Sequence, residues 1–166
     1  ARKRLGRDVL QYKPRIVVMQ FGINDSAVDV WKNPPAIAPR GPLAEYESNF
    51  RAMIGDAQKQ NAKVILMTTN PLRWTPLLKD KYGKPPYRPD AEDGFESPFL
   101  ASYNDFARKL AKELDVPLID IRAEYAGFAA GQRTTVDKLL LDGMHPNDLG
   151  HELVARLLLP VIRAQL

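Results

Sequence analysis

Hydrophobic residues along this chain form two kinds of pattern, short continuous runs and helically spaced stripes. Continuous runs bounded by turn residues are typical of strands buried on both faces of a parallel sheet, and they occupy residues 15–22, 62–70 and 116–121. Helical spacing predicts helices near residues 3–13, 46–57, 103–114 and 149–157. Because helices and strands alternate throughout, the pattern predicts an α/β fold with a parallel sheet between two helical layers.

The segments after the predicted strands carry the unusual residues. The first strand is followed by "GIND" (22–25) and a proline-rich stretch, and the second by about thirty residues without clear periodicity, a length that is more often functional than accidental. The third leads through a long segment to Asp142 and His145. Because parallel strands end at one edge of the sheet, we expect these three segments to open on the same edge.

Composition limits the classes of function. A length of 166 residues indicates a single domain, residues 1–166. The 24 Lys and Arg are scattered among 20 Asp and Glu, without the basic runs that indicate a nucleic-acid partner. No apolar run reaches the ~18–20 residues that span a membrane. The absence of cysteine excludes disulfides and thiol nucleophiles.

Asp142-x-x-His145 lies in a turn before the last predicted helix. In such a turn the carboxylate can bind the imidazole Nδ1–H, which leaves Nε2 free to take a proton from a hydroxyl nucleophile. A surface turn in which Asp142 only accepts backbone N–H groups is the alternative. His151 is interpreted as structural, and the spacing of the two histidines gives no reason to expect a metal site.

The GIND segment suits a second chemical role. Gly22 permits a sharp turn at the strand end, and Asn24 can point its amide into the cleft as a donor to a developing oxyanion. Asp25 is expected to hold the loop by accepting backbone donors. An ordinary Asn-Asp turn is the alternative, but a strand followed by GIND together with a later Asp-x-x-His is a more specific pair.

These two segments carry a resemblance to a known family. "VVMQFGIND" and "DGMHPNDLGHELVA" resemble the third and fifth sequence blocks of the SGNH hydrolases, also called GDSL-type esterases or lipases. The resemblance implies a three-layer α/β/α sandwich around a five-stranded parallel sheet. It also implies ester hydrolysis through an acyl-serine, with Asp142 and His145 in the triad, Asn24 in the oxyanion hole and no metal or organic cofactor. A secreted or periplasmic location is a further expectation from the family.

One family element has no counterpart among these residues. The Gly-Asp-Ser segment with the nucleophile is expected upstream of residue 1, together with two N-terminal strands, so residues 1–166 alone should be inactive. None of the four serines stands in a strand-to-helix elbow: Ser26, Ser48, Ser97 and Ser102. Without the neighbouring strand, the edge of the 15–22 strand is expected to be unpaired and open to self-association.

Two classes of function follow. The first is an ester hydrolase acting on short-acyl or carbohydrate esters, with a lysophospholipid or a thioester as other substrates. The second is a non-catalytic carbohydrate-binding or structural descendant of the fold. Trp31 and Trp74 in the loops suit stacking on sugar rings, and Arg73 suits an anionic group, unless these side chains only pack the loops onto the body.

Overall fold

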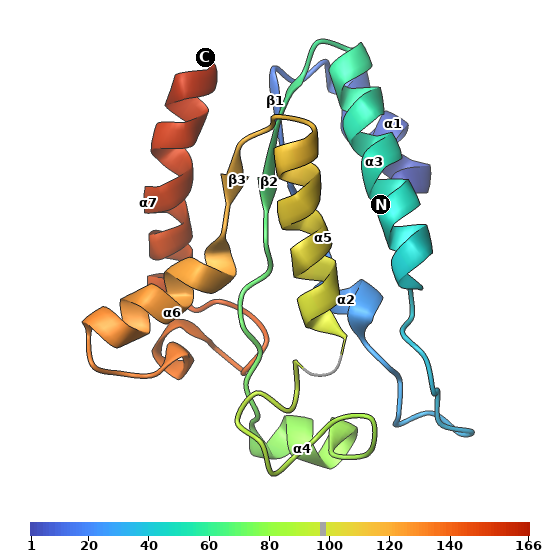
Figure 1. Cartoon of the computed structure of the whole chain (residues 1–166), viewed down its shortest axis with the longest axis vertical. Coiled ribbons are helices and arrows are strands. Elements are labelled where there is room, and N and C mark those ends of the chain that lie inside the picture. Colours follow the sequence, from blue (N-terminus) through green and yellow to red (C-terminus); the bar gives the residue numbers. More distant parts are fainter. Residues whose placement is uncertain (97–98) are drawn as a thin grey trace.

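A three-stranded parallel sheet runs through the centre of the computed structural model, which describes residues 1–96 and 99–166 (Figure 1). Its strands, β1 (Ile16–Gln20), β2 (Lys63–Met67) and β3 (Leu118–Ile119), lie in the order β1-β2-β3. Ile16 pairs with Lys63, and Leu66 pairs with Leu118. The three predicted strands and their parallel arrangement are confirmed.

Helices cover both faces of this sheet. On one side α3 and α5 pack over β1 and β2, and on the other side α6 and α7 pack over β2 and β3 (Figure 1). The predicted three-layer α/β/α sandwich is therefore confirmed, with three of the five strands that the family resemblance implies among the described residues. The helices are α1 (Leu5–Asp8), α2 (Ile23–Ser26), α3 (Leu43–Lys59), α4 (Pro76–Tyr82), α5 (Leu100–Glu113), α6 (Ile121–Gly131) and α7 (Asp148–Gln165), with 3₁₀ turns at Arg2–Arg4, Leu10–Tyr12 and Val136–Leu139.

The N-terminal helix predicted over residues 3–13 is wrong as a continuous element. The chain forms short turns there, because the backbone leaves helical geometry at Val9 (φ −133°) and becomes left-handed at Lys13 (φ 50°). Leu5 and Leu10 still reach the core, whereas Tyr12 is 73% exposed. Only part of the predicted apolar stripe is therefore buried.

The helices α4 and α6, like the single turn α2, were not predicted from the sequence. Thr75 caps α4 through its side chain, which accepts the Leu78 N–H at 3.3 Å, and Pro76 fits the first turn. Asp120 caps α6 in the same way, by accepting the Ala123 N–H at 3.2 Å. Both caps are visible in the sequence as a polar residue directly before a helical segment.

The long loops are packed around an apolar cluster of their own. Tyr87 connects two of them, since its hydroxyl accepts the Val28 N–H at 2.8 Å. The segment after β2, which shows no clear periodicity in the sequence, thus packs into a folded region beyond the sheet. The buried members of this apolar cluster are Val28, Val30, Leu72, Leu78, Tyr82, Tyr87, Phe95 and Leu100.

β1 is the edge strand of this sheet, with only β2 beside it among the described residues. Val17 and Met19 face the α3–α5 layer and are buried, but Val18 on the other face is 37% exposed. The prediction of a strand buried on both faces therefore holds for β2 and is wrong for β1.

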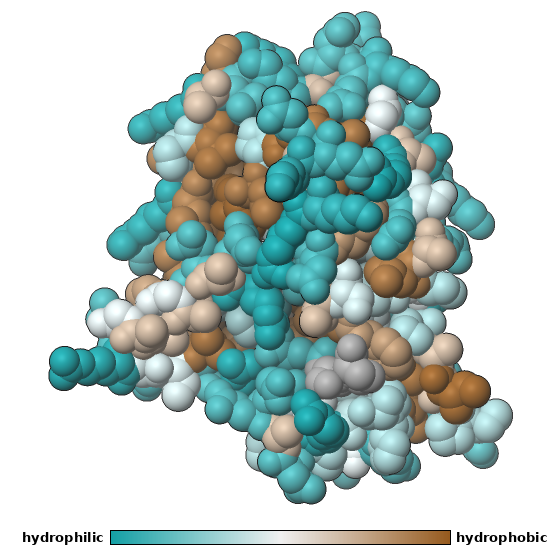
Figure 2. All heavy atoms as spheres, in the orientation of Figure 1, coloured by the Kyte–Doolittle hydropathy of each residue, from teal (hydrophilic) through white to brown (hydrophobic). Residues whose placement is uncertain are grey.

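Hydrophobic residues also reach the surface beside α7 (Figure 2). Within the described ranges, no helix combines the length and apolar character that crossing a membrane requires.

We expect a polypeptide of residues 1–166 to self-associate through β1. Because Lys63 donates its N–H to the Arg15 carbonyl at 2.9 Å, the alternation along the ladder turns the N–H of Val18 toward the open edge. Val18→Pro removes that donor and should reduce association in sedimentation velocity. Val18→Thr, which keeps the donor, should not. Equal association of the two variants, or a monomeric parent, would contradict the predicted association through β1.

Candidate active site

A groove lies where the carboxyl ends of β1 and β2 meet the turn before α7. The structure brings Gly22, Asn24 and His145 together in its walls, as the sequence predicts for the GIND segment and the histidine turn. In Figure 1, α2, α4 and the segment leading to α7 lie toward the same end of the sheet. The groove is lined by Gln20, Phe21, Gly22, Ile23, Asn24, Asp25, Thr69, Asn70, Met144, His145 and Pro146.

Asp142 and His145 form a hydrogen-bonded pair on the rim of the groove. The Asp142 Oδ2 atom lies 2.9 Å from Nδ1 of His145, while Oδ1 accepts the backbone N–H groups of Met144 at 2.9 Å and His145 at 2.8 Å. Asp142 therefore binds the ring as well as the backbone, so the alternative in which it only accepts backbone N–H groups is wrong. Since Nδ1 faces the carboxylate and the side chain is 68% exposed, Nε2 is available to a reacting group.

Three donors keep Asp142 ionised. Burial alone would raise the pKa of this carboxyl, but the hydrogen bonds from the His145 ring and from two backbone N–H groups lower it to about 2. A lowered folded-state pKa stabilises the turn above the ordinary value of 3.8, and this contribution is lost as the pH falls toward 2. The carboxylate therefore stays charged at neutral and mildly acidic pH.

The segment after β2 holds the histidine turn in place. The Arg73 N–H donates to the Gly143 carbonyl at 2.8 Å, and the buried Asn70 side chain donates to the Met144 carbonyl at 2.9 Å. Gly143 is left-handed (φ +84°), and a Cβ there would lie 2.4 Å from the Arg73 carbonyl oxygen. At α7, Asn147 caps the helix by accepting the Gly150 N–H at 3.0 Å.

The GIND segment forms the one-turn helix α2. Gly22, with φ +131°, makes the turn out of β1. Asn24 lines the groove, and its Oδ1 atom accepts a hydrogen bond from Nη1 of Arg40 at 3.0 Å. The loop is held by the backbone of Asp25, because its carbonyl accepts the Gly41 N–H at 2.9 Å. The expectation that the Asp25 carboxylate accepts backbone donors is wrong within the described part of the chain.

A small apolar cavity adjoins the groove. Ile23, Asn24 and Met144 line both spaces, so the Asn24 amide lies at their junction. The cavity measures about 40 Å³, room for about three water-sized groups. Its other lining residues are Ser26, Ala27, Arg40, Leu72, Tyr82, Tyr87, Phe95, Glu96, Phe99 and Leu100.

Similarity to known proteins agrees with this geometry. Residues 1–153 match the GDSL-like Lipase/Acylhydrolase family. The chain belongs to this family. The SGNH resemblance seen in the sequence is thereby confirmed.

Individual relatives extend the comparison. The chain is 29% identical over 149 residues to a Bacillus subtilis (strain 168) protein named uncharacterized lipoprotein YqeF, covering 87% of this chain but 58% of that one. A GDSL-like lipase from Bacteroides thetaiotaomicron VPI-5482 has a TM-score of 0.69 at 22% identity, with coverages of 99% and 70%. Axe2, an acetylxylan esterase from Geobacillus stearothermophilus, has a TM-score of 0.70 at 22% identity, with coverages of 96% and 64%.

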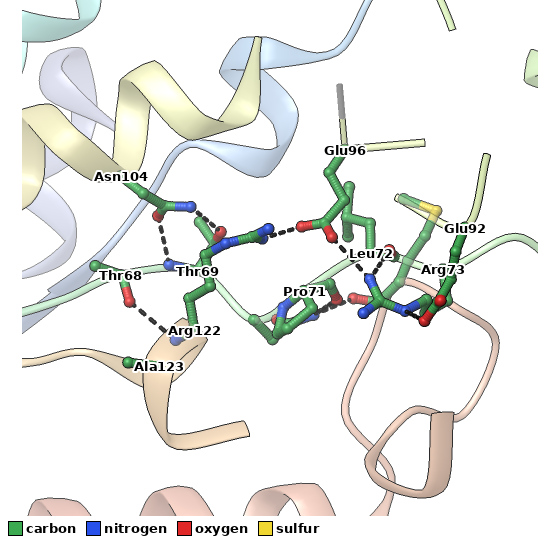
Figure 3. Close-up of polar contacts among 12 residues, drawn as sticks. Thr68, Thr69, Pro71, Leu72, Arg73, Glu92, Glu96, Asn104, Arg122 and Ala123 are labelled. Atoms are coloured by element: carbon green, nitrogen blue, oxygen red, sulfur yellow. Dashed lines mark hydrogen bonds and ion pairs between the residues drawn. The ribbon is translucent and has the colours of Figure 1, made fainter. Parts of the chain in front are cut away.

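Arg73 is used inside the fold of this GDSL-like chain. Its Nη1 atom lies 2.7 Å from the buried Glu96 carboxylate, which also pairs with Arg122 on α6 (Figure 3). Glu92 lies 3.5 Å from Arg73 Nε. The structure thus corrects the assignment of Arg73 to an anionic substrate group, because its charge is already compensated by two carboxylates.

The two loop tryptophans differ in their surroundings. Trp74 packs against Phe95 with ring centroids 4.8 Å apart and donates its Nε1–H to the Arg88 carbonyl at 3.1 Å. It therefore packs the loop onto the body, which corrects its assignment as a sugar-stacking residue. Trp31 is 46% exposed beneath the ammonium of Lys81, 4.9 Å from the ring centroid, and it is absent from the groove lining.

No described serine occupies a nucleophile position. Ser26 is buried and donates its hydroxyl to the Ile23 carbonyl at 3.2 Å, while Ser48 and Ser102 are exposed on α3 and α5. Ser97 lies outside the described residues. His151 is exposed on α7. Across the described ranges, no group of three or more His, Asp or Glu gathers to hold a metal ion.

Gly143→Ala should destabilise the full-length protein by about 1–3 kcal/mol, because the residue is left-handed and faces the Arg73 carbonyl. Gly127→Ala is the matched control: a Cβ there meets nothing within 4 Å in α6, so it should stabilise by about 0.4–1 kcal/mol. Urea unfolding measures both. Equal effects of the two substitutions would show that the turn is not packed as described.

Proposed function

We propose that the full-length protein is a serine ester hydrolase that uses this groove. The observation that carries the proposal is the shared opening of Asn24 and His145 onto one space, with His145 oriented by Asp142. Family membership supports the same class of reaction. We place the nucleophilic serine upstream of residue 1. A Geobacillus Axe2 variant with a serine-to-alanine change, called a catalytic mutant of an acetylxylan esterase, supports the serine mechanism.

His145, Asp142 and Asn24 each have a distinct role in this mechanism. His145 Nε2 takes the proton of the serine hydroxyl as that oxygen attacks the ester carbonyl, and Asp142 stabilises the imidazolium that forms. The Asn24 amide donates to the oxyanion of the tetrahedral intermediate. His145 then returns the proton to the leaving alcohol, and water repeats the sequence on the acyl-serine to release the acid.

The acyl group is proposed to be short. An ester whose carbonyl oxygen binds Asn24 has its acyl chain next to the adjoining cavity, since Asn24 and Met144 line both spaces. A volume of about 40 Å³ suits a small acyl group such as acetyl or propionyl better than a fatty acyl chain. Two Axe2 structures and a further acetyl xylan esterase of the same fold support a carbohydrate acetate as substrate.

We also propose that the protein acts outside the cytoplasm. The Bacillus subtilis relative that carries the name lipoprotein supports this location. A substrate of polysaccharide type would be met there. Trp31, exposed and flanked by Lys32 and Lys81, is proposed as a contact for such a substrate.

His145→Ala should reduce kcat of the full-length enzyme on p-nitrophenyl acetate by about 10³-fold or more, because the general base is lost. His151→Ala, on the exposed surface of α7, should change kcat little. Turnover is compared at equal concentrations of folded protein. Survival of the His145 variant together with inactivation of the His151 variant would overturn the assignment.

Leu72→Ala should extend the accepted acyl chain by enlarging the cavity. We expect the ratio of kcat/KM on p-nitrophenyl hexanoate to that on the acetate to rise about 10-fold. Leu110→Ala is the control, since it truncates an equally buried leucine on α5 that faces the other core. A similar change of the ratio in both variants would mean that the cavity does not hold the acyl group.

A further inference from the structure

The orientation of the Asn24 amide is fixed by a single charged partner. Arg40 Nη1 donates to Asn24 Oδ1 at 3.0 Å. A guanidinium only donates hydrogen bonds, so it can hold the oxygen end of the amide and not the NH₂ end. With Oδ1 turned to Arg40, Nδ2 is the end left for a partner in the groove that Asn24 lines.

Arg40 is itself held by a buried carboxylate. The Nε and Nη2 atoms of Arg40 lie 2.9 and 2.5 Å from Oδ1 of Asp29, whose side chain is only 6% exposed. Lys32 binds the other oxygen of Asp29 at 2.7 Å. The hydrogen bond from Arg40 lowers the pKa of Asp29 to about 2, so the pair is charged throughout the range in which an esterase works.

The backbone around this pair is also fixed. The Arg40 N–H donates to the Ala27 carbonyl at 2.9 Å, and the Ala36 N–H donates to the Asp29 carbonyl at 3.2 Å. Backbone hydrogen bonds therefore join the two ends of the loop between α2 and α3, and they hold the Arg40 guanidinium beside Asn24. Asn24 is exposed, so its amide would rotate freely without this contact.

We propose that Asp29 and Arg40 are positioning residues that present the Asn24 amide as an oxyanion donor. This inference rests on the proposed function. A hydrogen bond from a cation to the amide oxygen also polarises the amide and strengthens its N–H groups as donors. Arg40 thus acts on the reaction through Asn24, and Asp29 acts through Arg40.

The test compares Arg40→Lys with Arg51→Lys in the full-length protein. Lysine cannot bind Asp29 through two nitrogens and reach Asn24 as well. We expect kcat on p-nitrophenyl acetate to fall about 10- to 100-fold, with KM within about twofold, because a displaced donor costs less than the ~10²–10³-fold of its removal. Arg51 on α3 also forms an ion pair, with Glu113 at 2.7 Å, and neither residue lines the groove. Its substitution should therefore leave kcat unchanged.

A double-variant cycle identifies the route of the effect. In an Asn24→Ala background, Arg40→Lys should have no further effect on kcat, because the group that it positions is gone. An undiminished loss in that background would overturn the inference, since Arg40 would then act on the substrate directly or on the fold. Asp29→Asn should reproduce the Arg40→Lys phenotype, and wild-type kcat in that variant would also contradict it.

An NMR measurement separates this inference from the proposed function. The side-chain amide signal of Asn24, assigned by its loss in Asn24→Ala, should shift in Arg40→Lys and stay in place in Arg51→Lys. If the wild type shows no esterase activity but the signal shifts as expected, the proposed function fails while the positioning contact holds. An unmoved signal overturns the positioning role whatever the activity.

Discussion

The parallel pairing of β1 with β2 is the constraint on which the site depends. It ends both strands at one edge of the sheet, so Gly22 at the end of β1 lies beside the segment that continues β2. That segment then supplies Asn70 and the Arg73 backbone to the histidine turn. Two parts of the sequence more than a hundred residues apart are thereby brought to the lining of one groove. A shift of one residue in the strand register would move the GIND segment relative to His145.

Charged partners give two polar groups of the groove a defined orientation. Asp142 fixes the ring of His145, and Arg40 fixes the amide of Asn24. The Asp142 carboxylate can only accept hydrogen bonds, so it selects a ring nitrogen of His145 that carries hydrogen. The Arg40 guanidinium can only donate, so it selects the oxygen end of the Asn24 amide. Away from the groove, Glu96 holds Arg73 and Arg122 together and joins the long loop to α6 (Figure 3). These ion pairs add to the apolar packing that holds the long loops on the body.

The sequence predicted the parts of the structure that have a local signal. Apolar runs located the three strands, and the Asp142–His145 spacing located the pair that the structure brings to 2.9 Å. The uneven burial of β1 could not be read from its residues, because Ile16–Gln20 is about as apolar as the central strand Lys63–Met67. The unpaired edge was expected only from the family resemblance. Trp74 and Arg73 looked like substrate contacts because their internal partners, Phe95 and Glu96, lie more than twenty residues away in the sequence.

Arg40 was missed for a related reason. It stands in a proline-rich loop, sixteen residues after Asn24, and its salt bridge to Asp29 follows from how that loop closes. No periodicity or motif marks such a contact.

The missed helices α4 and α6, by contrast, had a usable signal in the sequence. Thr75 and Asp120 are their caps, and α6 also has the helical spacing of Ile121, Tyr125 and Ala129.

The central claim is that Asn24 and His145 serve a serine that residues 1–166 do not supply. Labelling the full-length protein with a fluorophosphonate and locating the label by mass spectrometry tests it most directly, because the reagent reacts with a serine that a neighbouring base activates. The account predicts one stoichiometric label on a serine upstream of residue 1, lost when His145 is replaced by alanine. A label on Ser26, Ser48, Ser97 or Ser102, or labelling that persists without His145, would contradict it.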